Sequence, residues 1–199
     1  NKNNDGVDLE YSKNVLIEGV SFNNSDDNIA IKAGRDHEGR ANADLPSENI
    51  IIRNNTFKGL HALVIGSEMS AGVRNIFMED NKASGYLKRG IYFKTNFDRG
   101  GYIRDIHISD LALKKVEDCL FITANYHGEG SGNYPSKISN VTIANVSCQN
   151  ASNTGIVIEG FESSKVENIL LRNINIRNAK NGLTLTHTQN VVMDEVVIG

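Results

Sequence analysis

A few acidic and basic residues of this chain have the types and positions that acid–base chemistry needs. Asp5, Asp27 and His61 each stand two residues before an apolar alternation, Asp26 directly precedes Asp27, and Lys94 follows a later alternation. Carboxylates that are crowded together raise one another's pKa, and one of them can then act as a general acid near neutral pH. A single Asp at such a place is more often only a turn residue. The chemistry therefore depends on whether the fold brings these groups together.

An internal repeat indicates the elements that must position these residues. One motif reads Asn or Asp, apolar, any, apolar, any, and then usually Asn, Asp or Gly; its seven copies begin at Asn14, Asn49, Asn75, Asp105, Asn140, Asn168 and Asn190. A second motif is an apolar-any-apolar alternation that often follows a small residue; its seven copies begin at Asp5, Asp27, His61, Arg89, Asp118, Thr154 and Asn181. The two motifs alternate strictly. Because this periodicity is two residues, with no helical signal, we expect strands throughout the chain.

The spacing of the repeat predicts an all-β fold, a parallel β-helix (a single-stranded solenoid) of about seven coils. Starts of the first motif are 22 to 35 residues apart, and each repeat holds at least two strands. Each coil then adds one strand to each long sheet, about 4.8 Å from the previous coil. Stacked Asn side chains at the corners would satisfy backbone groups, with Asn54, Asn55, Asn145, Asn173 and Asn178 as candidates. Leucine-rich and propeller folds are excluded because their signatures are missing.

Aligning the second motif by its apolar positions predicts how the functional groups lie. The inward pairs are Val7/Leu9, Ile29/Ile31, Leu63/Ile65, Ile91/Phe93, Leu120/Ile122, Ile156/Ile158 and Leu183/Leu185. Asp5, Asp26–Asp27 and His61 then occupy neighbouring levels at one edge of a groove, and Lys94 lies one coil further. Glycosidic hydrolysis needs such carboxylates, one to protonate the leaving oxygen and another to activate water. A long face with Lys residues favours an acidic polysaccharide as substrate.

Composition and charge exclude other classes of protein. The 199 residues are 39% hydrophobic and 23% charged, which permits one sizeable core and does not suggest disorder. No apolar run approaches the roughly 20 residues of a membrane span, and a net charge of -3 argues against a nucleic-acid partner. The 26 Asn beside only 2 Pro suit many turns or stacked Asn ladders. Cys119 and Cys148 are too few for a disulfide framework, and we expect two buried free thiols.

At the same residues the sequence resembles the polygalacturonase family, glycoside hydrolase family 28, especially its bacterial members. The family's Asn-Thr-Asp-Gly, Asp-Asp, Gly-His-Gly and Arg-Ile-Lys motifs correspond in order to Asn3–Gly6, Asp26–Asp27, Leu60–Ala62 and Tyr92–Lys94. A downstream tyrosine of the family, one coil later, looks like Tyr126. The order agrees across residues 3–95, and the repeat extends the likeness over the whole chain.

The resemblance implies a right-handed β-helix that hydrolyses the α-glycosidic bonds of a galacturonate-containing pectic polysaccharide with inversion, without a metal or other cofactor. Asp26 would be the general acid, Asp5 and Asp27 would hold and activate the water, and His61 would support the protonation of the acid. Lys94 would bind a substrate carboxylate, and the remaining substrate-binding candidates are Asn3, Tyr92 and Tyr126.

Three departures from the family pattern bear on the substrate. Tyr92 stands where the family has a substrate-binding Arg, and a phenol cannot replace a bidentate carboxylate clamp. Leu60 and Ala62 replace two Gly around His61, which we expect to reduce the room beside the substrate. We therefore expect a modified or branched chain, such as rhamnogalacturonan or a substituted galacturonan. Lys88 and Arg89, just before the same strand, are the alternative source of the missing charge, but we expect them to form a solvated turn pair.

Two insertions interrupt the repeat, at residues 35–48 and 125–135, and such loops on a rigid scaffold commonly carry specificity. They could close one end of the groove and make the enzyme exo-acting. His37, His107, His127 and His187 lack metal-ligand spacing, and we expect them at the surface or in loops.

Two rival functions stay open, a β-helical polysaccharide lyase and a non-catalytic carbohydrate-binding β-helix. A lyase would use Ca²⁺ bound by carboxylates such as Asp5, Asp26 and Asp27. We expect one β-helical domain over residues 1–199, with catalytic coils in 1–95 and further coils in 96–199, as a fragment of a longer β-helix. The expected partner is the pectic polymer alone, with no nucleic acid and no membrane, the protein being a monomer. Because such polymers lie outside the cell, we expect a secreted or periplasmic location.

Overall fold

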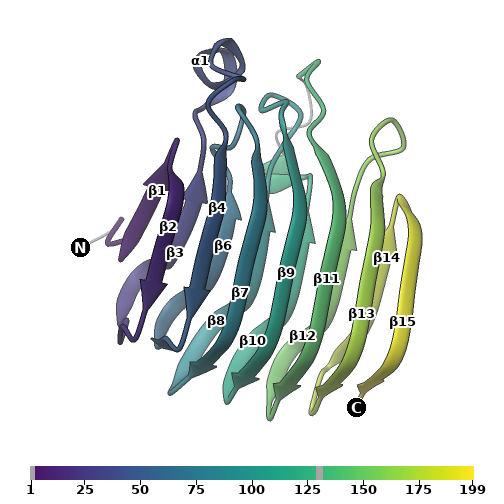
Figure 1. Ribbon diagram of the computed structural model, residues 1–199. Helices are drawn as coiled ribbons and strands as arrows, with labels where there is room; N and C mark the ends of the chain where they lie inside the picture. The colour runs from purple at the N-terminus through teal and green to yellow at the C-terminus, as the bar shows by residue number, and fades with distance from the viewer. Residues whose placement is uncertain (1–2, 129–131) are drawn as a thin grey trace.

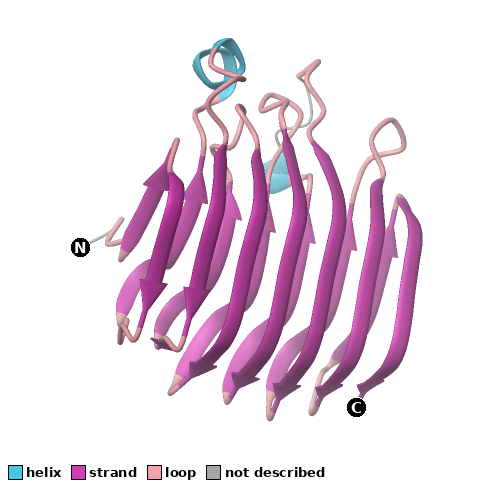
Figure 2. Ribbon diagram, viewed as in Figure 1, coloured by secondary structure: helices cyan, strands magenta, loops and turns pink. Residues whose placement is uncertain are grey.

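The chain forms a right-handed parallel β-helix, here described by a computed structural model for residues 3–128 and 132–199 (Figures 1 and 2). One sheet has the order β1-β3-β6-β8-β10-β12-β14, and the other has the order β15-β13-β11-β9-β7-β4-β2, with the short β5 beside β7. In this described part each of seven coils gives one strand to each sheet, which confirms the predicted fold.

The strands of the first sheet are β1 (Val7–Glu10), β3 (Asn24–Lys32), β6 (Gly59–Gly66), β8 (Tyr86–Lys94), β10 (Lys115–Thr123), β12 (Ala151–Glu159) and β14 (Asn181–Thr186). The strands of the second sheet are β2 (Lys13–Glu18), β4 (Ser47–Arg53), β5 (Thr56–Phe57), β7 (Val73–Ala83), β9 (Tyr102–Leu113), β11 (Lys137–Cys148), β13 (Val166–Ile176) and β15 (Thr188–Ile198). The helical segments are α1 (Asp36–Ala41) and the 3₁₀ turn η1 (Tyr126–Gly128).

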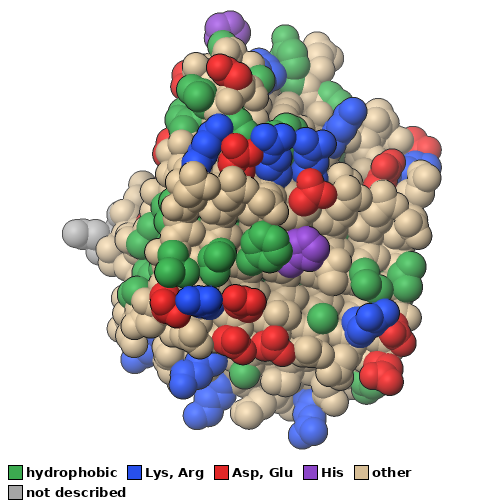
Figure 3. All heavy atoms as spheres, in the orientation of Figure 1, with side chains coloured by type: hydrophobic (Ala, Val, Ile, Leu, Met, Phe, Trp, Pro, Cys, Tyr) green, Lys and Arg blue, Asp and Glu red, His purple; other side chains and the backbone are tan. Residues whose placement is uncertain are grey.

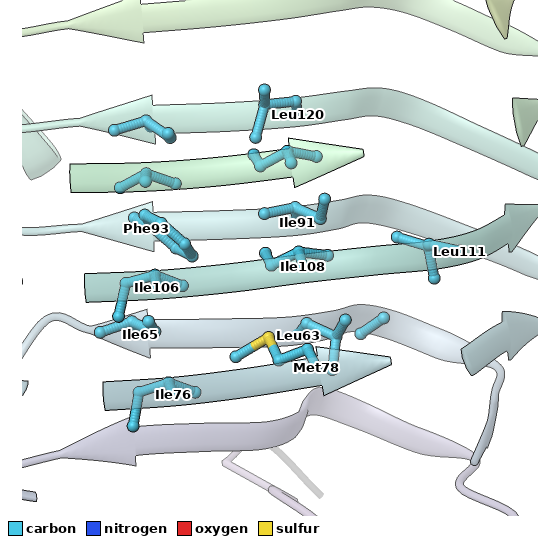
Figure 4. Packing of buried hydrophobic residues seen from close by; sticks show 14 of the residues in the cluster. Leu63, Ile65, Ile76, Met78, Ile91, Phe93, Ile106, Ile108, Leu111 and Leu120 are labelled. Atoms are coloured by element: carbon cyan, nitrogen blue, oxygen red, sulfur yellow. The ribbon is translucent and has the colours of Figure 1, made fainter. Parts of the chain in front are cut away.

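The core lies between the two sheets and consists of stacked apolar side chains. The register pairs Ile29 with Leu63, Leu63 with Ile91 and Ile91 with Leu120, as the alignment of the second motif predicts. Figure 4 shows Leu63 and Ile91 of this stack beside side chains of the opposite sheet, such as Met78 and Ile108. This register matters for function because it also fixes the levels of the polar residues that precede each strand.

Asn and Asp residues shape the corners of the coils in two ways. The first residue of every copy of the first motif has a φ between 53° and 57°, a left-handed conformation that Asn and Asp tolerate better than most residues. Their side chains also stack between coils, as where Asn49 donates a hydrogen bond to Asn14 at 3.2 Å and Asn190 donates to Asn168 at 2.6 Å. The high Asn content therefore reflects both turns and ladders.

Among the predicted corner residues, Asn55 is buried and satisfies backbone groups of the preceding coil. Its side-chain oxygen accepts from the Val20 amide at 2.9 Å, and its amide nitrogen donates to the Ile17 carbonyl at 3.0 Å. Asn173 donates to Asn145 at 2.8 Å in an exposed stack. The predicted role of Asn at the corners is confirmed at these positions.

The expectation of strands throughout is wrong in the first insertion, which contains α1. Polar and small residues such as Asp36 and Gly39 leave this segment no apolar alternation, and it extends beyond the ends of the strands (Figure 1). Arg40 stacks on the ring of Tyr134 at 3.6 Å, and Tyr11 donates to Glu38 at 2.6 Å. The insertion is thus attached to neighbouring loops by polar and aromatic contacts.

The outer face of the second sheet carries alternating charges, and Figure 3 shows this face. Arg53 pairs with Glu18 at 2.8 Å, and Glu48 lies between Lys13 and Arg74, at 3.1 and 2.6 Å.

No helix among the described residues is long and apolar enough to cross a membrane. Cys119 and Cys148 are both buried and free, as expected.

Candidate active site

Six of the eight predicted site residues line one cavity of about 570 Å³ beside the first sheet, namely Asn3, Asp5, Asp26, Asp27, Lys94 and Tyr126. Asp26 and Asp27 come from β3 and Lys94 from the end of β8, while Asn3 and Asp5 precede β1. The predicted register brings them together because each coil repeats the same path. Tyr126 reaches the cavity from η1, in the second insertion, whose residues 129–131 lie outside the described part of the chain.

Asp27 is the centre of a buried polar cluster. Its Oδ1 lies 2.7 Å from Nδ1 of His61, and its Oδ2 accepts from Nζ of Lys94 at 2.9 Å. Burial acts to raise the pKa of Asp27, but the hydrogen bond to His61 and the ammonium of Lys94 outweigh it and hold the pKa below its usual value. Asp27 is therefore a fixed negative charge between a histidine and a lysine.

His61 is buried and is not among the residues that line the cavity. Because Asp27 is ionised, Nδ1 of His61 donates the hydrogen bond between them. Nε2 is buried and has no hydrogen-bond partner among the described residues, and the ring meets Tyr92 edge-on at 5.1 Å. His61 thus orients Asp27 directly.

Asp5 and Asp26 differ from Asp27 in their surroundings. Burial and the nearby charges of Asp8 and Asp26 raise the pKa of Asp5 to about 6, although Lys32 opposes the shift. Asp26 is half-buried, and its Oδ1 accepts a hydrogen bond from the backbone amide of Asp27 at 2.9 Å. The environment therefore separates the carboxylates into one that binds protons easily, Asp5, and one that stays ionised, Asp27. Such a separation is typical of acid–base sites.

The cavity is more acidic than the sequence suggests. Its lining contains five carboxylates and two ammonium groups. Both ammonium groups are already paired, Lys94 with Asp27 at 2.9 Å and Lys32 with Asp8 at 2.9 Å and with Asp5 at 3.6 Å. The lysines of this face therefore balance protein carboxylates first, and they do not make the cavity basic.

Four lining residues had no predicted role: Asp8, Lys32, Ser67 and Glu68. Asp8 and Lys32 occupy outward positions on β1 and β3, next to the predicted residues. Their positions in the repeat could therefore have identified them as lining residues. Ser67 and Glu68 directly follow β6, the strand that contains His61.

Tyr92 does not line this cavity. Its side chain is 4% exposed and packs on Ala30 and Val64, at the outward positions of the two preceding strands. Burial raises the pKa of Tyr92 to about 12, so the phenol stays neutral. Tyr92 instead borders a second cavity on the side of the later coils.

The expected solvated turn pair at Lys88–Arg89 is wrong for Arg89. Arg89 lies within β8, where its side chain is 17% exposed and its Nε donates to Asp118 at 3.2 Å. Its guanidinium also covers the rings of Tyr92 and Phe121, at 4.2 and 4.1 Å from their centroids. The column of residues that contains Asp27 and His61 continues through Arg89 and Asp118, which places these opposite charges on adjacent strands.

The residues beside His61 do not narrow the cavity, contrary to expectation. Ala62 points into the core and is fully buried, and Leu60 borders a separate depression with Gly59 and Asn24. A strand residue next to His61 points to the opposite face, so the added side chains lie away from the catalytic groups.

The one group of side chains that could hold a metal ion in the described part of the chain already makes hydrogen bonds with protein groups. Asp26, Asp27 and His61 offer ligand atoms within 4.8 Å of one another, and this is the group of such residues in the described part of the chain that could hold a metal. However, the ammonium of Lys94 already binds Asp27, and Nδ1 of His61 is occupied by the same carboxylate. A metal ion here would have to displace a resident positive charge.

The fold is a parallel β-helix, and carboxylates suited to proton transfer converge on one of its faces. These two features together define a class of carbohydrate-active proteins. The model of the Glycosyl hydrolases family 28 matches residues 1–195, so the chain belongs to this family.

Related proteins agree with this assignment. A probable polygalacturonase of Vitis vinifera is 33% identical over 137 residues, 68% of this chain and 28% of the relative. An endo-polygalacturonase of Pectobacterium parmentieri is 31% identical over 163 residues, 82% of this chain and 37% of the relative. The chain thus spans less than half the length of the curated relatives it matches.

Solved structures support the fold. A hyperthermoactive exopolygalacturonase from Thermotoga maritima superposes with a TM-score of 0.84 at 34% identity, over 96% of this chain and 44% of that chain. A family 28 exopolygalacturonase of Yersinia enterocolitica has a TM-score of 0.71 at 19% identity, over 96% of this chain and 37% of that chain, and shows the fold alone.

Proposed function

We propose that the protein hydrolyses α-glycosidic bonds in a galacturonate-containing pectic polysaccharide, with inversion at the anomeric carbon. The observation that carries this proposal is the convergence of Asp5, Asp26 and Asp27 on one cavity in three different environments. The family and its polygalacturonase relatives support the same reaction.

In this reaction Asp26 protonates the leaving oxygen, as its position in the family motif implies. Asp5 is the base that activates the water, because a carboxylate with a pKa of about 6 is a stronger base than an ordinary one and is still ionised above that pH. Asp27, held by His61 and Lys94, keeps a negative charge beside the water and orients it.

The specific substrate is a modified pectin or rhamnogalacturonan, and Tyr92 is the feature that supports this. A buried neutral phenol stands where the family has a carboxylate-binding Arg, so plain polygalacturonan loses a bidentate partner at this position. Leu60 and Ala62 do not line the catalytic cavity and so do not bear on the choice of substrate.

The decisive test is the release of reducing ends by the protein and by its Asp26→Asn variant. The panel contains polygalacturonan, rhamnogalacturonan and substituted galacturonans. Asp26→Asn should lower the rate by about 10²–10⁴-fold, the usual contribution of a general acid. Asp44→Asn, which changes an exposed residue of the first insertion, is the matched control and should retain activity.

Other outcomes would refute the proposal in recognisable ways. An unsaturated product that absorbs ultraviolet light and disappears with a chelator would indicate a lyase. Binding without turnover, unaffected by Asp26→Asn, would indicate a carbohydrate-binding β-helix. Proton NMR of the first product gives the anomeric configuration, and retention instead of inversion would contradict the roles given to Asp5 and Asp27.

We further propose that the protein acts as a monomer. We also propose that it acts outside the cytoplasm, because its polymeric substrate does not enter cells. Analytical ultracentrifugation and assays of the culture medium and periplasm test these two points.

A further inference from the structure

Two thiols that the proposed reaction does not use lie in the core of a single coil. Cys119 belongs to β10 and Cys148 to β11, and each residue is 1% exposed. Both side chains are part of the apolar cluster between the two sheets. The neighbouring coils show how these two positions lie relative to each other, because the register of a β-helix repeats from coil to coil.

In the preceding coil the two positions face each other across the core. By the register of the sheets, Cys119 stands beside Gly90, and Cys148 pairs with Leu113. A Cβ atom built on Gly90 would lie 2.5 Å from Cδ1 of Leu113, so the side chain of Leu113 occupies the space in front of Gly90. One coil later, the same geometry directs Cys119 and Cys148 toward each other.

The following coils repeat the combination of Gly with a large aliphatic residue. Gly155 and Ile176 occupy the two positions in the next coil, and Gly182 and Ile198 occupy them in the one after. A Cβ atom on Gly182 would lie 3.8 Å from Cγ2 of Ile198, which is ordinary contact. Two cysteines have as many side-chain heavy atoms as Gly with Leu or Ile, so the cysteine coil conserves the packed volume. It changes both positions together, as a covalent link between them requires.

The two thiols are also in contact with each other. A hydrogen bond between them raises the pKa of Cys119, which burial raises further, and it lowers the pKa of Cys148. The thiolate is the form of cysteine that attacks a disulfide. Cys148 is therefore the better nucleophile of the pair, and Cys119 is placed to react second.

We propose that Cys119 and Cys148 form a disulfide that links the two sheets through the core and stabilises the fold. The structure contains the reduced form of this pair. The oxidant is a small disulfide such as oxidised glutathione: the thiolate of Cys148 displaces one glutathione thiolate, and Cys119 then loses its proton and displaces the other. The two cysteines lose two protons and two electrons, and one glutathione disulfide becomes two glutathione thiols. Because both side chains are buried, this exchange takes place while the chain folds.

The bond would close a loop between β10 and β11 that contains Tyr126, a residue of the catalytic cavity. Such a link stabilises a protein mainly by restricting the unfolded chain. Disulfides persist outside the cytoplasm, which is the location proposed above. The inference does not require the protein to be a hydrolase, so each of the two proposals can fail without the other.

The test refolds the unfolded, reduced protein in a mixture of oxidised and reduced glutathione, and in parallel with a reductant alone. After the glutathione mixture, mass spectrometry under denaturing conditions should show a mass lower by about 2 Da, that of the two hydrogens lost, and no alkylation by iodoacetamide. A non-reducing peptide map should join the peptides that contain Cys119 and Cys148. The reduced protein should instead be alkylated at both cysteines once it is unfolded. The oxidised form should melt at a temperature higher by about 4–16 °C, the range for a disulfide in a chain of this length.

One matched variant and one alternative preparation keep the test decisive. Cys119→Gly/Cys148→Leu restores the combination of the preceding coil, so its melting temperature should be the same with and without the glutathione mixture. Protein produced in the periplasm of a bacterial host needs no refolding, and it should show the same lower mass. Two free thiols in both oxidised preparations, glutathione retained on either cysteine, a disulfide between two chains, or an oxidised form that melts no higher than the reduced one would each overturn the proposal.

Discussion

The acidic limb of the pH–rate profile should depend on Asp8, although this residue has no direct role in the proposed reaction. Asp5 has a pKa of about 6, and after burial the charge of Asp8 is the largest cause of that shift. Because Asp5 must be ionised to act as a base, kcat/KM should fall as the pH drops through about 6. Asp8→Asn should move this limb to lower pH.

The Asp8→Asn change has two effects, and both lower the pKa of Asp5; together they determine how far the acidic limb moves. Asp8→Asn removes a like charge near Asp5, and it releases Lys32, which now pairs with Asp8 at 2.9 Å and lies 3.6 Å from Asp5. At partly exposed sites each such effect is worth roughly 0.2–1 kcal/mol. Since one pKa unit is 1.36 kcal/mol, the two together predict a shift of about 0.3–1.5 pH units.

The assay is reducing-end release between pH 4 and 8 at constant ionic strength, with kcat/KM reporting the free enzyme. Glu18→Gln is the matched control, because it changes the net charge equally but lies on the opposite sheet. The difference between Asp8→Asn and the unmodified protein should shrink in high salt. An unmoved limb, or a move to higher pH, would refute the assignment of this limb to Asp5.

Three further predictions concern stability and accessibility. Lys94→Met should cost about 3–5 kcal/mol in the free energy of unfolding, because it leaves the buried carboxylate of Asp27 without its cation; denaturant titration measures this. Asn55→Leu leaves the buried carbonyl of Ile17 and the part-buried amide of Val20 without their partner, and should cost about 1–3 kcal/mol by the same titration. Cys119 and Cys148 are buried and free, so mass spectrometry should detect no alkylation by iodoacetamide until the protein is unfolded.

Matched variants make these results specific. Lys82→Met changes an exposed lysine of β7, and Asn133→Ala changes an exposed asparagine between strands; each should alter stability by less than about 0.5 kcal/mol. Alkylation of either cysteine in the native protein, or unchanged stability of Lys94→Met, would contradict the burial and pairing described for these residues.

The sequence alone was sufficient for the β-helix, its register and the grouping of Asp5, Asp26 and Asp27. In a solenoid each coil repeats the path of the previous one, so alignment of Ile29, Leu63 and Ile91 in the sequence is also their alignment in space. The Asn residues at the corners were also predicted, and the structure adds that their backbone is left-handed, a conformation that favours Asn and Asp. The helix α1 was missed because its insertion lies outside the repeat.

Side-chain partners across coils were decided only by the tertiary structure. The sequence places Lys94 and Arg89 on one strand, but whether each faces a substrate or a protein carboxylate depends on rotamers and on groups from other coils. Lys94 meets Asp27, and Arg89 meets Asp118 over two aromatic rings. The pKa of about 6 at Asp5 likewise results from burial and several charges together. A repeating backbone can be derived from residue spacing, whereas electrostatics depends on distances between side chains that spacing does not fix.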